Sequence, residues 1–172
     1  MKLSPTTKIQ FKRRRLGKTN YKKRLELVKS GKPRLIVRKS LNYITAQIIE
    51  FDIKGDKTIL SANSRQLKKL GWNFACDNLP AAYLTGLALG KQAVKSKIAE
   101  AVLDLGLHTS TKGNRLYAVA KGASDAGLKI NLGEEVLPTE ERLKGSHIAA
   151  YKNKFKDLPQ AFEKIKSQIL GV

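Results

Sequence analysis

GKPRLIVRKSLNYITAQIIEF, residues 31–51, predicts two β-strands joined by a tight turn. The first predicted strand runs from Leu35 to Val37 and the second from Tyr43 to Phe51. Because side chains alternate along a strand, one face of the second strand is expected to carry Ile44, Ala46, Ile48 and Glu50. The rest of the chain is organised around this hairpin.

The turn of the hairpin, Arg38 to Asn42, carries two cations, a hydroxyl and an amide. Basic and polar groups at the end of an apolar scaffold suit contacts with the phosphates and sugars of a nucleic acid. A solvated turn whose charges guard a sheet edge against aggregation explains the same residues. The hairpin alone leaves both interpretations open.

The composition favours the first interpretation. The chain has 172 residues, with 34 Lys and Arg against 14 Asp and Glu, a net charge of +20. Such an excess indicates a polyanionic partner, with nucleic acid first and an anionic membrane second.

The sequence also argues against a membrane or secreted protein. No apolar run approaches the roughly 20 residues of a spanning helix, and the basic N-terminus lacks the apolar segment of a secretory signal. Cys76 is the only cysteine, so no intramolecular disulfide or cysteine zinc cluster is expected. We expect a cytoplasmic protein without a cofactor, a membrane partner or a small-molecule substrate.

The positive charge is concentrated at the start of the chain. Residues 1–34 hold 13 basic residues and one acid, Glu26, and so carry +12 of the net +20. A segment with charge of one sign stays unfolded until a partner neutralises it. A nuclear-type address or a solvated tail would also explain the run, but not the charge elsewhere. We therefore expect a basic RNA-binding arm at 1–18, a single α/β domain at 19–151 and a helical C-terminal extension at 152–172.

The remaining elements follow from hydrophobic spacing and from capping residues. Helices are expected over residues 20–28, 65–70, 80–96, 116–126 and from 145 onward, and further strands over 58–62, 100–105 and 128–132. Thr19 and Ser64 are the expected caps of the first two helices.

Gly86 and Gly90, one turn apart, are expected to let their helix approach a sheet closely. Trp72 could stack on a base, although packing at the rim of the core is the preferred interpretation. The order of elements predicts an α/β (α+β) fold with a mixed, mostly antiparallel sheet covered by helices.

An enzyme is the weaker hypothesis. The chain has no visible nucleophile–base constellation, and His108 and His147 lack closely spaced partners for a metal site. Asp52, Asp104 and Asp125 lie near predicted strand or helix ends and could hold Mg²⁺ beside a phosphate, which makes a Mg-dependent nuclease one alternative. Each of the three also fits an ordinary structural role. We therefore expect no catalytic residue and no metal site.

Several short motifs occur in order along the chain. They are Thr19-Asn20-Tyr21, Ser30 to Leu35, Arg38-Lys39-Ser40, Ala46-Gln47, Gly71-Trp72, Asn78 to Gly86, Ala101 to Leu107, Gly122 to Leu128 and Gly145 to Ile148. Together they resemble the large-subunit ribosomal protein that binds 5S rRNA, in its archaeal and eukaryotic form. The resemblance covers roughly residues 8 to 151 and does not extend to the stretch from Lys152 onward. One departure is Asn20, where the family more often has Asp.

The resemblance implies a structural constituent of the large ribosomal subunit. Such a protein binds 5S rRNA and helps attach it to large-subunit rRNA in the central protuberance, near the other 5S-binding ribosomal protein. The RNA-binding residues that it implies are Lys12, Arg13, Arg14, Arg15, Tyr21, Lys22, Arg24, Lys32, Pro33, Arg34, Arg38, Lys39, Ser40 and Asn42. To these we add the nearby cations and those of the polar loop 108–115, namely Lys8, Lys18, Lys23, Lys112 and Arg115. A protein that binds or compacts RNA or DNA without specificity is the alternative, but it gives no role to the motif-rich core.

Overall fold

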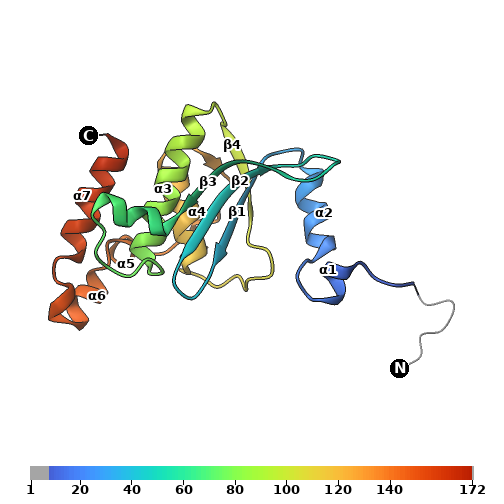
Figure 1. Cartoon of the computed structure of the whole chain (residues 1–172). Helices are drawn as coiled ribbons and strands as arrows, with labels where there is room; N and C mark the ends of the chain where they lie inside the picture. The colour runs from blue at the N-terminus through green and yellow to red at the C-terminus, as the bar shows by residue number, and fades with distance from the viewer. Residues whose placement is uncertain (1–7, 172) are drawn as a thin grey trace, which may run out of the picture.

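Five strands form one mixed sheet in the order β3-β2-β1-β4-β5 (Figure 1). The strands are β1 Arg34–Lys39, β2 Ile44–Glu50, β3 Lys57–Asn63, β4 Glu100–Asp104 and β5 Lys129–Ile130. The first three strands pair antiparallel, whereas β4 pairs parallel with both β1 and β5. This computed structural model describes residues 8–171, so residues 1–7 of the predicted arm and Val172 lie outside the described residues. The predicted mixed sheet with helices is confirmed.

The β1–β2 hairpin has the predicted position and the predicted apolar face. Its register runs from the pair Arg34 and Ile49 to the pair Lys39 and Ile44. The expected core side chains are fully buried at Ile44, Ala46 and Ile48. Glu50, expected on the same face, is exposed, and Ile49 is buried instead. The β2–β3 register shifts between Ile48 and Ile49, and such a bulge breaks the alternation that the prediction used.

Helices occupy most of the remaining chain. They are α1 Lys12–Arg15, α2 Tyr21–Lys29, α3 Leu79–Lys95, α4 Arg115–Asp125, α5 Glu140–Lys144, α6 Ser146–Tyr151 and α7 Leu158–Leu170, with 3-10 turns at Ser64–Leu70 (η1), Glu134–Val136 (η2) and Asn153–Phe155 (η3). Two predicted caps are wrong by one residue. Asn20 caps α2 in place of Thr19, and Asn63 caps η1 in place of Ser64, because an asparagine carbonyl accepts the free amides at a helix start as well as a hydroxyl does.

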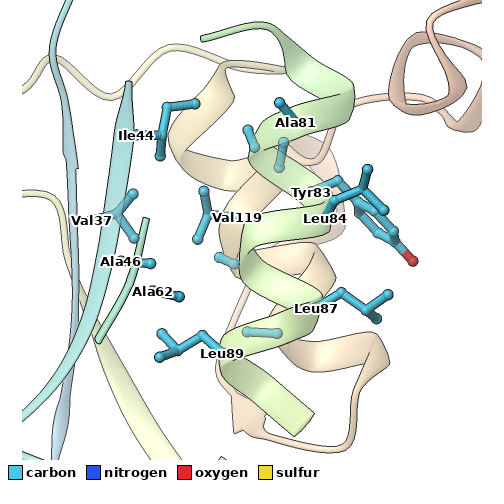
Figure 2. Close-up of a cluster of buried hydrophobic side chains, with 14 of the residues drawn as sticks. Val37, Ile44, Ala46, Ala62, Ala81, Tyr83, Leu84, Leu87, Leu89 and Val119 are labelled. Carbon is cyan, nitrogen blue, oxygen red and sulfur yellow. The ribbon is translucent and has the colours of Figure 1, made fainter. Parts of the chain in front are cut away.

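The core lies between the sheet and the helices α3 and α4. In Figure 2, Val37 and Ala46 of the sheet point toward the helices, and Leu89 of α3 points toward the strands. The other side of α3 is covered by α7, where the rings of Tyr83 and Phe162 have their centroids 5.5 Å apart. Phe162 of α7 is only 2% exposed. The C-terminal helix thus belongs to the core of the domain.

Small residues allow α3 and α4 to cross closely. Gly86 and Gly90 face α4, so the predicted role in approaching a sheet is wrong: a Cβ at Gly90 would lie 2.7 Å from the carbonyl oxygen of Ala123. From the other side, a Cβ at Gly122 of α4 would overlap the carbonyl oxygen of Tyr83. The helix backbones themselves form this contact, and no side chain fits between them.

The close crossing predicts a large cost for one methyl group. Gly122→Ala should lower the free energy of unfolding by about 2–3 kcal/mol, because an overpacked site forces backbone shifts. Gly133→Ala is the matched control, since Gly133 has a φ of −73° and a Cβ there would meet nothing within 4 Å. It should change stability by at most about 1 kcal/mol. Urea unfolding followed by circular dichroism measures both, and equal stability of the two variants would contradict the prediction.

Candidate nucleic-acid interface

The helices α1 and α2 lie on the side of the sheet opposite to α3 and α7 (Figure 1). A groove of about 830 Å³ lies between these two helices, the outward face of β1 and the end of β4. Its charged lining consists of Arg13, Lys18, Lys23, Arg24, Arg34, Arg38, Glu26, Asp56 and Asp104. Because β1 turns Leu35 and Val37 into the core, Arg34, Ile36 and Arg38 face this groove. Cations from separate parts of the chain therefore meet at one surface.

Five charges of alternating sign connect the elements around the groove. Arg24 of α2 donates two hydrogen bonds, of 2.7 and 2.8 Å, to the carboxylate of Asp56 in the β2–β3 loop. Arg34 of β1 donates a 2.6 Å hydrogen bond to the same carboxylate. Asp104 of β4 then pairs with Arg34 at 3.5 Å and with Arg38 at 3.2 Å. We call these five residues the arginine–aspartate chain.

The burial of Arg34 makes its two aspartate partners important to the stability of the fold. The side chain of Arg34 is only 2% exposed, and a buried guanidinium is costly unless anions and hydrogen bonds compensate it. The hydrogen bond from Arg24 lowers the pKa of Asp56, partial burial opposes this shift, and the hydrogen bond from Arg34 adds to it. The hydrogen bond between Arg24 and Asp56 also raises the pKa of Arg24. Arg24 and Asp56 therefore form a charged pair at neutral pH.

Arg38 lies flat against the end of β4. Its guanidinium donates to the carbonyl oxygens of Val37 and Asp104, each at 2.8 Å. Gly106, with a φ of +62°, leaves room for it, since a Cβ there would lie 2.7 Å from the Arg38 Cζ. Burial lowers the pKa of nearby His108, and the charges of Lys39 and Arg38 lower it further. The neutral form of this imidazole is thus favoured in the groove.

The hairpin turn is closed by a side chain. The hydroxyl of Ser40 donates to the carbonyl oxygen of Tyr43 at 2.9 Å and accepts from the amide of Tyr43 at 3.0 Å. Ser40 therefore shapes the turn, while Lys39 and Asn42 are exposed beside it. Leu41, at the tip, is 92% exposed, and its exposure was not predicted from the sequence.

The predicted RNA-binding residues do not all lie at the groove. Those that line it are Arg13, Lys18, Lys23, Arg24, Arg34 and Arg38, and those exposed near it on α1, α2 and the hairpin are Lys12, Arg14, Arg15, Lys22, Lys39 and Asn42. Lys8 is exposed ahead of α1. Four others are engaged with the protein itself: Lys32 with Glu100, Lys112 with Glu135, Arg115 with Asp77, and Tyr21 with Phe11, while Pro33 is half-buried.

Arg34 is the predicted contact whose position fits least. Its side chain is buried between Asp56 and Asp104, so it supports the interface from below.

Trp72, considered for base stacking, is 1% exposed and donates from Nε1 to the carbonyl oxygen of Ala75, which confirms the packing interpretation. Asp56 was missed, because its turn Lys54-Gly55-Asp56-Lys57 indicated only a change of direction. An acid between two lysines, Lys54 and Lys57, was the one available signal.

Comparisons with known proteins show the family of the chain. The sequence model of a family described as ribosomal large subunit proteins 60S L5 and 50S L18 matches residues 6–100 and 94–132. The chain belongs to this family. It is also 49% identical over 170 residues to the large ribosomal subunit protein uL18 of Methanococcus maripaludis, across 99% of this chain and 88% of the relative. The similarity thus includes the C-terminal region that the sequence motifs left unmatched.

Membership of the 60S L5 and 50S L18 family makes the protein a structural constituent of the large subunit of the cytoplasmic ribosome, with rRNA as a partner.

The family is not enzymatic, so the nuclease hypothesis is wrong. Its three proposed ligands are also engaged separately: Asp52 accepts from the amide of Lys54, Asp104 pairs with arginines, and Asp125 accepts from the hydroxyl of Tyr83. Within residues 8–171, no three His, Cys, Asp or Glu side chains gather as a metal site would require. None of the described helices combines the length and apolar character needed to cross a bilayer.

The lowered pKa of Asp56 predicts a pH-dependent contribution to stability. Its carboxylate stabilises the fold above the unfolded-state pKa of about 3.9, and this contribution is lost as the pH falls through the lower pKa of the folded state. Asp56→Asn should therefore be less stable than wild type at pH 7, by about 1.5–3 kcal/mol for the lost charged hydrogen bonds, and the difference should shrink below about pH 4. Urea unfolding at pH 7 and pH 3 measures this, and a difference that is the same at both values would contradict it.

Proposed function

We propose that the protein binds 5S rRNA and helps attach it to large-subunit rRNA in the central protuberance, beside the other 5S-binding ribosomal protein. The observation that carries the proposal is the groove in which cations of α1, α2 and β1 meet. The motifs that resemble the 5S-binding family support the same partner. They include the hairpin turn Arg38-Lys39-Ser40, which begins at this groove with Arg38.

The binding mechanism is electrostatic positioning of the RNA backbone. Lys and Arg side chains around the groove neutralise phosphates and release their counterions. The β1–β2 turn and α1 lie along the same edge of the molecule in Figure 1, so a backbone that follows this edge meets both. Arginine forks on α1 can take two phosphate oxygens or a guanine edge. The sheet holds the hairpin turn at a fixed angle to the RNA.

The three parts of the chain divide this work. The arm of residues 1–18 supplies further positive charge to the RNA, and residues 19–151 form the 5S rRNA-binding domain with the groove. Residues 152–172 contain α7, which covers α3 on the side away from the groove. Their role is to complete the core that supports the hairpin, rather than to contact 5S rRNA.

Substitution of a single lysine tests whether RNA binds at a defined interface or is attracted only by the net charge. Lys39→Ala should weaken binding to 5S rRNA and reduce the slope of log affinity against log salt by about 0.7 to 0.9, the value for one phosphate contact. Lys164→Ala removes the same charge from an exposed position on α7 and should leave both quantities nearly unchanged. Filter binding over a salt series measures them. Equal losses in the two variants would indicate that only net charge matters.

Competition between RNAs tests specificity directly. The wild-type protein should retain 5S rRNA at salt concentrations that release an unrelated structured RNA of equal length, because contacts that read shape or bases are less sensitive to salt. Electrophoretic mobility shifts at a series of salt concentrations give both affinities. If the two RNAs dissociate together, the protein is a non-specific binder of nucleic acid, which is the alternative function.

A further inference from the structure

We propose that Asp56 is a positioning residue for RNA binding: it is an anion that strengthens the association with a polyanion, because it holds α2 against the sheet. This inference rests on the proposed binding of 5S rRNA and deepens it. Asp56 lines the same groove as the cations that would contact the RNA. A purely electrostatic view gives this carboxylate the opposite effect, since an acid beside the RNA repels phosphate.

The first step of the argument is that α2 has little else to hold it. None of its residues is fully buried, and Leu25 on this helix is 56% exposed. Apart from bonds at its own ends, the described side chains of α2 make one hydrogen-bonded connection to the rest of the protein, the pair of Arg24 and Asp56. The orientation of α2 therefore depends strongly on this ion pair. The helices α3 and α4 are held mainly by their buried residues instead.

The second step is that Asp56 is itself fixed. Its Oδ2 accepts a 2.6 Å hydrogen bond from Arg34, whose side chain is 2% exposed and is also paired with Asp104 of β4. The carboxylate thus connects α2 to β1 and β4 through groups that have little freedom to move. An arginine bound by two parallel hydrogen bonds to such a carboxylate has a defined direction as well as a defined distance.

The third step concerns the cations that α2 carries. Lys22 and Lys23 are exposed on this helix, and Lys23 lines the groove. When α2 is docked, these charges lie where the RNA backbone meets β1. When it is undocked, the same charges remain but their positions are spread. The apparent dissociation constant rises by the inverse of the docked fraction, so a fall of that fraction to about a tenth weakens binding about tenfold.

The test compares two acids of one loop in the full-length protein. Asp56→Asn and Asp52→Asn each remove one negative charge. Among residues 8–171, the carboxylate of Asp52 accepts only from the amide of Lys54, which an asparagine oxygen can also do. With 5S rRNA, Asp52→Asn should bind as tightly as wild type or more tightly. Asp56→Asn should bind about tenfold more weakly, although its net charge is equally increased. With the unrelated RNA of equal length, neither variant should lose affinity.

A second pair of variants covers the case in which Asp56→Asn fails to fold. Arg24→Met leaves Asp56 paired with Arg34, so the sheet keeps its internal ion pairs. Lys23→Met removes the same charge from the next position of α2, and should reduce 5S affinity less than Arg24→Met. Amide hydrogen exchange of α2 in the free protein gives a readout without RNA. It should be faster in Asp56→Asn and Arg24→Met than in wild type, and unchanged in Lys23→Met.

Three results would overturn the inference: 5S binding by folded Asp56→Asn that is as tight as that of Asp52→Asn, equal losses in Arg24→Met and Lys23→Met, or α2 exchange that neither Asp56→Asn nor Arg24→Met accelerates. Failure of the proposed function is a separate result. It would appear in wild type alone, as equal affinity for 5S rRNA and the unrelated RNA at every salt concentration.

Discussion

The buried guanidinium of Arg34 is the constraint on which the groove depends. Removing such a charge from water costs several kcal/mol unless anions and hydrogen bonds replace the lost hydration. The two anions come from distant parts of the chain, Asp56 in the β2–β3 loop and Asp104 at the end of β4. The loop must therefore fold back over β1, and β4 must end beside it. A single buried cation in this way fixes where three segments meet.

Strand β1 contributes side chains to two surfaces at once, and this explains the position of the proposed RNA-binding groove. Leu35 and Val37 enter the core under α3 and α4, while Arg34 and Arg38 face the groove. The helix-covered face is closed by backbone contacts at Gly122 and by α7. The other face carries the basic groove. The alternation of one strand thus separates the face that provides stability from the face at which we propose that RNA binds.

Local patterns could be predicted from the sequence, and long-range pairs could not. Alternation located the hairpin and its buried face, because burial of apolar side chains follows a period of two. The prediction for Glu50 was wrong because a bulge is a property of two paired strands. The glycine spacing in α3 indicated a close contact but not its partner, which is α4. Arg34 resembled its neighbouring cations in the sequence, and its burial between Asp56 and Asp104 distinguishes it in the structure.

Charge and geometry act over different distances, and this decides the effect of an acid within a basic surface. One carboxylate among the charges of a chain with a net charge of +20 weakens the attraction to RNA only slightly. That penalty is screened over about 8 Å at physiological salt. The hydrogen bonds between Asp56 and Arg24, at 2.7 and 2.8 Å, are much shorter than this screening length, so salt weakens the attraction within this pair less. Added salt therefore reduces the repulsion between Asp56 and the RNA more than it loosens α2. The balance moves toward the positioning effect under the conditions in which specific binding has to exceed non-specific binding.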